Sequence, residues 1–178
     1  MLKRLLRRPL TWAILLVLAI GAGAGLYWFE PWRLVTNTTV NDALAPAAET
    51  AGASAAPTTS QAGPTIVLRG TFITHEHDTS GEVRVVRHPD GRHQLELVNL
   101  DTSDGPDLRV WLSDQPVKAG TAGWRVFDDG RWVELGELKG NKGNQVYDIP
   151  ASADLASLRS VSIWCKRFAV SFGAAALA

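Results

Sequence analysis

The feature that most constrains this chain is an uninterrupted apolar segment close to its N-terminus. From Leu10 to Phe29 the sequence runs 20 residues without a charged side chain. A helix of that length rises about 30 Å, which matches the hydrocarbon thickness of a membrane. Basic residues crowd before it and aromatic residues gather at 27–32, which is typical of a cytoplasmic N-terminus and an outer interfacial belt. We therefore expect a basic cytoplasmic segment (1–9), a single-pass transmembrane helix that contacts the lipid bilayer through 10–29, and a chain displayed outside the cell membrane.

A cleaved signal peptide is the alternative interpretation of the same segment. Lys3 to Arg8 would form its basic region, and Ala22 to Ala24 offer small residues at the spacing of a cleavage site. The apolar run nevertheless continues through Leu26 and ends in aromatic residues, as a retained anchor does. Both interpretations export the rest of the chain.

The next part of the chain, 30–64, is predicted to be a juxtamembrane segment and a flexible linker. Between about Asn41 and Pro64 the composition shifts to Ala, Thr, Ser, Gly and Pro. Such a segment buries too little apolar surface to offset its ordering entropy. One folded domain of ordinary size then remains, over 65–178.

Alternation of apolar and polar residues dominates that domain and predicts an all-β fold, an antiparallel β-sandwich or barrel-like domain. The clearest hairpin is signalled by Asp90-Gly91 between two alternating runs. A second hairpin is expected around Asp128-Asp129-Gly130, and 136–145 reads as a loop. The strands expected are Ile66–Ile73, Glu82–Arg87, His93–Leu100, Leu108–Leu112, Trp124–Phe127, Arg131–Leu135 and Val146–Ile149.

The last part of the domain carries one irregularity. Pro150 to Leu158 could form a helical turn capped by Ser152. The alternation of Val161 to Phe172 then slips by one residue near Cys165. Because a one-residue slip sends side chains to the wrong face, we expect a β-bulge or a corner at Cys165 to Arg167.

Charge and motifs exclude several classes of function. Four of the 18 basic residues lie in the first eight positions, so the remainder is mildly acidic and lacks the basic patch of a nucleic-acid-binding protein. No nucleophile elbow, zinc-protease helix or phosphate-binding glycine loop is present. Whether the chain is an enzyme stays open.

Cys165 is the single cysteine of the chain, and it has two interpretations. A free thiol in an exported domain cannot form an intramolecular disulfide, and Lys166 and Arg167 beside it would favour a reactive thiolate. Alternatively, Cys165 is a small buried hydrophobic residue, which is common for free cysteines.

His75 and His77 are candidate metal ligands. On a strand, residues at i and i+2 point to one face, so the two imidazoles could bind an ion together. With Cys165 nearby they would form the ligand set of an electron-transfer copper site. A solvated polar turn is the alternative.

The sequence resembles the DM-thirteen domain, also called the electron-transfer DM-thirteen domain, over about 65–177. The motifs that carry the resemblance are Thr79-Ser80-Gly81-Glu82-Val83-Arg84-Val85, Gly105-Pro106-Asp107-Leu108-Arg109-Val110-Trp111-Leu112, Leu135-Gly136-Glu137-Leu138, Asn144-Gln145-Val146-Tyr147-Asp148-Ile149-Pro150, Ser160-Val161-Ser162-Ile163-Trp164-Cys165 and Phe168-Ala169-Val170-Ser171-Phe172-Gly173.

This resemblance implies an extracytoplasmic β-sandwich-like module in which Cys165 acts in electron transfer. The thiol would work bare or, with Trp164 beside it, as the ligand of a prosthetic group such as haem. The redox partner would be a separate protein. The leading hypothesis is therefore a membrane-anchored electron-transfer or redox accessory, and the second is a non-catalytic cell-envelope binding domain whose cysteine is structural.

Overall fold

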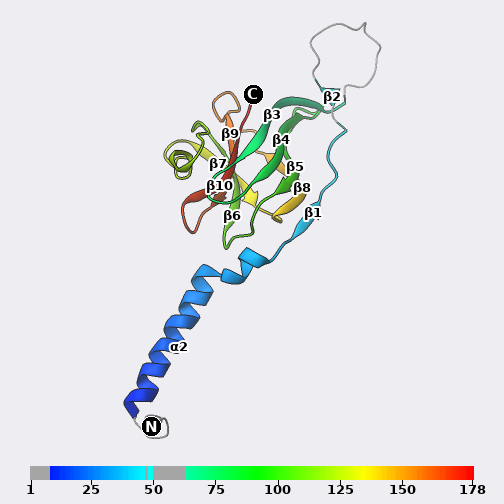
Figure 1. The fold of residues 1–178 in the computed structure, drawn as a ribbon. Coiled ribbons are helices and arrows are strands. Elements are labelled where there is room, and N and C mark those ends of the chain that lie inside the picture. Colours follow the sequence, from blue (N-terminus) through cyan, green and yellow to red (C-terminus); the bar gives the residue numbers. More distant parts are fainter. Residues whose placement is uncertain (1–8, 47, 50–62) are drawn as a thin grey trace, which may run out of the picture.

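The computed structural model describes residues 9–46, 48–49 and 63–178. A long apolar helix precedes one β domain (Figure 1). The basic residues of the predicted cytoplasmic segment and most of the predicted flexible linker lie outside the described residues. In chain order the elements are α2 (Pro9–Phe29), a 3-10 turn η1 (Pro31–Val35), β1 (Thr39–Asn41), β2 (Ala48–Glu49), β3 (Thr65–Thr74), β4 (Ser80–Arg87), β5 (His93–Asp101), β6 (Leu108–Ser113), η2 (Thr121–Gly123), β7 (Trp132–Glu137), β8 (Lys142–Ile149), β9 (Ser160–Cys165) and β10 (Val170–Ala176).

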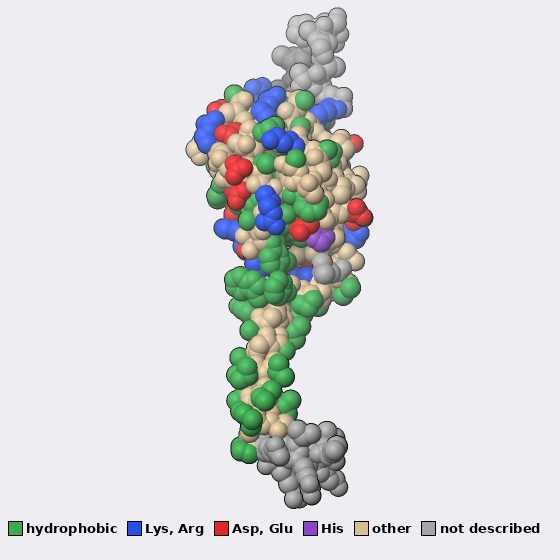
Figure 2. Space-filling view, turned by 60° about the vertical axis from the view of Figure 1, so that its left-hand side comes forward, with side chains coloured by type: hydrophobic (Ala, Val, Ile, Leu, Met, Phe, Trp, Pro, Cys, Tyr) green, Lys and Arg blue, Asp and Glu red, His purple; other side chains and the backbone are tan. Residues whose placement is uncertain are grey.

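Helix α2 has the length and composition to cross a membrane. None of its side chains is buried by the rest of the protein, and the face of the helix seen in Figure 2 carries hydrophobic side chains. The β domain in the same view carries basic and acidic groups intermixed with apolar ones. An apolar helix left uncovered by its own protein needs an apolar surrounding, either a membrane or the export machinery that handles signal sequences.

The β domain is mostly one curled sheet that forms a half-barrel (Figure 1). In the described part of the chain its strand order is β1-β8-β5-β4-β3-β10-β9-β6-β7, and β2 pairs with β3 beside that path. Strand β3 joins the two halves because Thr65 to Thr71 pair with β4, whereas Phe72 to Thr74 pair with β10. This confirms the predicted all-β, barrel-like class.

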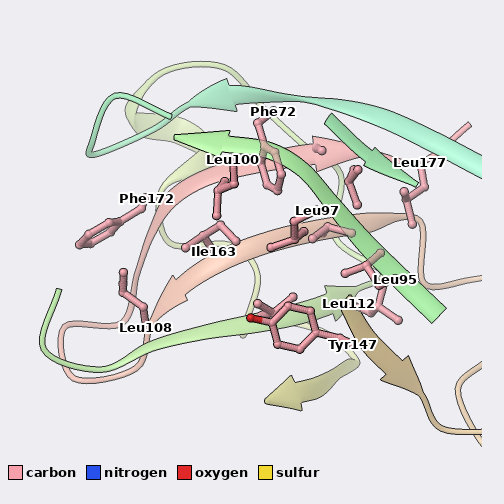
Figure 3. Packing of buried hydrophobic residues seen from close by; sticks show 14 of the residues in the cluster. Phe72, Leu95, Leu97, Leu100, Leu108, Leu112, Tyr147, Ile163, Phe172 and Leu177 are labelled. Atoms are coloured by element: carbon pink, nitrogen blue, oxygen red, sulfur yellow. The ribbon is translucent and has the colours of Figure 1, made fainter. Parts of the chain in front are cut away.

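The concave side of the sheet encloses the main core. Aliphatic residues of the β4, β5 and β8 half face residues of the β6, β9 and β10 half, as Figure 3 shows. Leu95, Leu97 and Ile163 have essentially no exposed surface, so each contributes about 1.5 to 3 kcal/mol of hydrophobic stabilisation. Tyr147 of β8 connects the two ends of the sheet, because its hydroxyl donates to the carbonyl of Glu137 in β7 at 3.3 Å.

The segment after α2 pairs with the domain instead of running free. Strand β1 lies parallel to β8, and Thr38 N donates to the Asn141 Oδ1 atom at 2.7 Å. The Asp42 carboxylate pairs with Lys139 at 2.6 Å. The ordered chain therefore extends past Asn41, the point where the sequence predicted the flexible linker to begin.

The hairpin expected at Asp128-Asp129-Gly130 is not formed. Trp124 to Phe127 are not a strand, and β7 pairs with β6. The long connection between β6 and β7 instead folds over the convex side of the sheet, where Phe127 joins a second apolar cluster with Trp111 and Trp164. The alternation of apolar and polar residues from Trp124 to Phe127 thus arises because the segment packs onto the sheet, although it is not a strand of that sheet.

Two expectations about the end of the domain are also corrected. The segment 150–158 forms turns and not a helix, and the expected loop 136–145 contains the end of β7 and the start of β8. The phase slip after Cys165 is a complete chain reversal between β9 and β10, which pair antiparallel. The irregularity within that pairing lies at Ser171 to Gly173.

Candidate functional site

Cys165 is the last residue of β9 and faces the main core. It pairs with Leu108 of β6 on one side and with Val170 of β10 on the other. No part of Cys165 is exposed to solvent, and it forms no disulfide. The thiol is therefore enclosed by apolar side chains on the concave side of the sheet.

The electrostatic environment of the sulfur has two opposing parts. Burial raises the pKa of the Cys165 thiol above its ordinary value, since the thiolate loses hydration. The backbone amides of Phe168, Arg167 and Asp107 act in the other direction and lower the pKa, but the net shift is upward. The surroundings therefore favour the neutral thiol.

The turn that follows Cys165 is held by remote parts of the chain. Lys166 N donates to the carbonyl of Asp107 at 2.9 Å. The Arg125 guanidinium donates to the carbonyls of Phe168 and Ala169 at 3.0 and 3.2 Å. Ala169 adopts a φ of 49°, in the left-handed region that L-residues rarely occupy. These contacts fix the backbone of the turn that follows Cys165.

The end of α2 lies against the same turn. The Arg167 guanidinium donates to the carbonyl of Trp28 at 2.7 Å and pairs with Glu30 at 3.3 Å. The rings of Phe29 and Phe168 stack with centroids 5.8 Å apart. The turn that carries Cys165 is therefore the part of the β domain that meets α2.

A polar cavity of about 350 Å³ adjoins this turn. Asp107, Leu108 and Arg167 line it, whereas Cys165 does not. Arg109 crosses one wall and pairs with Asp107 at 2.7 Å and with Glu137 at 3.1 Å. Leu108 and the turn separate the sulfur from this cavity.

Trp164 lies on the other side of the sheet from Cys165. Consecutive residues of a strand point to opposite faces, so Cys165 enters the main core and Trp164 enters the cluster on the convex side. The Trp164 ring stacks on Trp111 at 5.1 Å and meets Phe127 edge-on at 6.3 Å. Hence the two predicted cofactor residues do not share one pocket.

The two candidate histidines sit beyond the end of β3 and occupy different surroundings. His75 is buried, and its ring nitrogens contact the Ser171 hydroxyl at 2.9 Å and the Lys118 carbonyl at 3.0 Å. Burial lowers the pKa of His75, and the Lys118 carbonyl partly offsets this. The His77 ring lies over Phe172, with centroids 3.9 Å apart. Both imidazole nitrogens of His75 are thus already engaged by protein groups.

These residues, as placed, do not fit the copper or haem site that the sequence suggested. Over residues 9–46, 48–49 and 63–178 no three His, Cys, Asp or Glu side chains form a group that could hold a metal ion. A haem iron needs an axial ligand that reaches it, whereas the Cys165 sulfur is sealed from the adjoining cavity.

Sequence reasoning singled out Cys165 as a candidate but missed the residues that hold the turn beside it. Lys166 and Arg167 were expected to act on the thiol by charge. Their side chains instead pair with Glu134 and Glu30. The chain reversal that directs them there is signalled by no Gly or Pro.

Comparison with known proteins places the domain in a family. Residues 71–177 match the family model described as electron transfer DM13. No curated protein and no solved structure is significantly similar to the chain.

Proposed function

The chain belongs to the electron transfer DM13 family, and from that membership we propose that its β domain is an electron-transfer module with Cys165 as its redox-active group. The observation that carries the proposal is that Cys165, the single cysteine of the chain, lies inside the matched segment 71–177 and directly before a turn that Arg125 holds in place.

Burial of the thiol limits the chemistry to electron exchange through the protein. Thiol–disulfide exchange requires a partner sulfur to touch the attacking thiolate, and Cys165 has no exposed surface. An electron, by contrast, can pass through packed side chains, and in this proposal the S–H proton passes at the same time to the Asp107 carboxylate, whose charge acts on the thiol. The partner in this proposal is a separate redox protein that never contacts the sulfur.

Voltammetry of the purified full chain in detergent tests the proposal. We expect a reversible redox wave in the wild type that Cys165→Ala lacks, because this variant removes the sulfur and leaves an apolar side chain. Circular dichroism of both proteins controls for folding. Identical voltammograms of the two proteins would overturn the role of Cys165.

A structural role for Cys165 in a non-catalytic cell-envelope binding domain is the second candidate. Its support is the complete burial of the thiol and the direction in which burial shifts its pKa. It predicts that Cys165 reacts with an alkylating agent only after unfolding and that Cys165→Ala keeps every property except stability. Absence of a redox signal together with that labelling pattern would select this function.

We also propose that α2 is retained as a single-pass membrane anchor, with the β domain outside the cytoplasm. The support is an apolar 21-residue helix with no buried side chain and its aromatic C-terminal end. Membrane fractionation with alkaline washing tests retention. N-terminal sequencing of the mature protein tests the signal-peptide alternative, since cleavage near Ala22 to Ala24 would remove most of the helix.

A further inference from the structure

Three tryptophans of neighbouring strands form a continuous stack on the convex side of the sheet. Trp132 of β7 lies on Trp111 of β6 with ring centroids 4.0 Å apart and planes 3° apart. Trp111 in turn lies on Trp164 of β9 at 5.1 Å and 23°. Centroids of aromatic pairs typically lie about 4.5 to 7 Å apart, so the first pair is closer than this range and the second lies within it. The indole rings therefore form an unbroken path across three strands.

The stack runs from the surface to the residue before Cys165. Trp132 is 40% exposed, Trp111 3% and Trp164 1%. Trp164 is joined to Cys165 by one peptide bond, although their side chains lie on opposite faces of β9. One end of the path thus meets solvent, and the other ends one residue from the enclosed sulfur.

The middle of the stack has a fixed proton acceptor. The Trp111 indole nitrogen donates to the Glu134 carboxylate at 3.2 Å. Lys166 and Arg109 pair with the same carboxylate at 3.3 and 3.4 Å. An indole that loses an electron becomes a strong acid, so a carboxylate already bonded to its N–H can take the proton without rearrangement.

We propose that Trp132 and Trp111 are the electron port of the domain, that is, the site at which an electron leaves or enters it, and that Glu134 is the proton acceptor. A one-electron oxidant, such as an oxidised metal centre of a partner, takes one electron from the stacked pair, and the Nε1 proton of Trp111 moves to the Glu134 carboxylate. The pair is left as a neutral radical and the oxidant is reduced by one electron. A one-electron reductant reverses the step, and the proton returns from Glu134 to Nε1.

This inference rests on the proposed function and supplies what that function lacks, a route to a buried thiol. The geometry also assigns the partner's docking position. The exposed Trp132 lines a shallow cavity together with Arg131 and Ser152, so the partner's redox centre approaches this part of β7. The partner protein therefore does not need to touch Cys165.

A photo-oxidant attached beside Trp132 tests the port in the full chain. Ser152→Cys provides an exposed thiol that a ruthenium polypyridyl label can modify while Cys165 stays buried. After a light flash and quenching of the label, we expect a neutral tryptophan radical by transient absorption. Trp132→Phe in the labelled protein should slow its formation about tenfold, which corresponds to about 1.4 kcal/mol in barrier.

Two further variants separate the port from general oxidation. Trp124→Phe makes the same chemical change in a tryptophan outside the stack and should leave the rate unchanged. Glu134→Gln keeps a hydrogen-bond acceptor but no base, so the transient spectrum should become that of the radical cation. A wild-type rate in Trp132→Phe, or an equal loss in Trp124→Phe, would overturn the port.

Cys165→Ala in the labelled protein distinguishes failure of the port from failure of the proposed function. The port alone predicts that the radical forms at the wild-type rate in this variant. The redox role of Cys165 predicts in addition that the radical lives longer, since the thiol can no longer supply an electron to the radical and its proton to the Asp107 carboxylate. Equal lifetimes would contradict the role of Cys165 while leaving the port intact.

Discussion

The β4–β5 and β9–β10 hairpins reverse the chain by different means. In the first, His88 N donates to the Arg92 carbonyl at 2.8 Å, and Gly91 N donates to the His88 carbonyl at 2.9 Å. The Asp90 carboxylate accepts from Arg92 N at 3.0 Å. Every one of these partners lies within five residues, so this turn is specified by its own sequence.

The second reversal depends on partners far away in the chain. Arg125 bonds two of its carbonyls, Asp107 bonds Lys166 N, and Arg167 bonds the end of α2. Its own residues include no Gly, Pro, Asn or Asp. The comparison teaches that the proposed functional residue sits where tertiary contacts, and not local preferences, determine the backbone.

Replacing the thiol should give the largest effect on the second hairpin. We expect Cys165→Ser to lower the free energy of unfolding by about 1 to 3 kcal/mol, because a hydroxyl in an apolar enclosure loses its hydration. Cys165→Ala is the matched control and should cost less, since it buries no polar group. Urea denaturation measures both. Equal stabilities of wild type and Cys165→Ser would contradict an apolar, water-free environment around residue 165.

Removing a remote support should have the next largest effect. Arg125→Ala deletes two hydrogen bonds to the Phe168 and Ala169 carbonyls and should cost about 1 kcal/mol. Arg92→Ala in the first turn removes only a solvent-exposed ion pair and should leave the denaturation midpoint unchanged. A comparable loss in both variants would abolish the distinction between the two turns.

Exchanging glycine and alanine should move the two hairpins in opposite directions. Gly91 has a φ of 85° with open space around it, so Gly91→Ala should cost about 1 kcal/mol of backbone strain. Ala169 already bears such strain at a φ of 49°, so Ala169→Gly should gain about 0.5 kcal/mol. Thermal unfolding checks the signs. A loss of stability in Ala169→Gly would contradict strain at that position.

Mild acidification, to a pH just below neutral, should weaken the β9–β10 hairpin more than the β4–β5 hairpin, and this is the smallest of the expected effects. His75 contacts Ser171 of β10, and burial lowers its pKa below the ordinary value of 6.5. The unfolded chain therefore binds the proton more readily, and stability falls as the pH drops below about 6.5. Hydrogen exchange should report faster opening of β10 amides than of β4–β5 amides. His75→Gln should remove this pH dependence, and its persistence there would assign it to another group.

The sequence predicted those elements whose signals are local. The apolar run predicted 10–29 and the helix is Pro9–Phe29. The Asp90-Gly91 pair predicted a hairpin that forms, because glycine at a positive φ suits a tight turn. Alternation also predicted most strands of the domain, since period-two burial follows from strand geometry itself.

Elements that depend on distant contacts could not be predicted in this way. Trp124 to Phe127 alternate like a strand, yet Phe127 is buried because the segment packs over a sheet built elsewhere. The Cys165 reversal looked like an irregular strand, because its turn conformation comes from Arg125 and Asp107. For the same reason the sequence singled out Cys165 as a candidate but predicted neither the contacts that hold its turn nor the tryptophan stack, whose members are separated by up to 53 positions.

The pairing of β1 with β8 has a consequence for how the protein would meet its partner. Nine residues separate Phe29 from Thr39, and five of them form the η1 turn. If α2 spans the bilayer, so short a connection keeps the domain close to the lipid headgroups and restricts its rotation relative to the membrane. A partner diffusing along the same membrane would then find it by a search in two dimensions, at an orientation set largely before the two proteins touch.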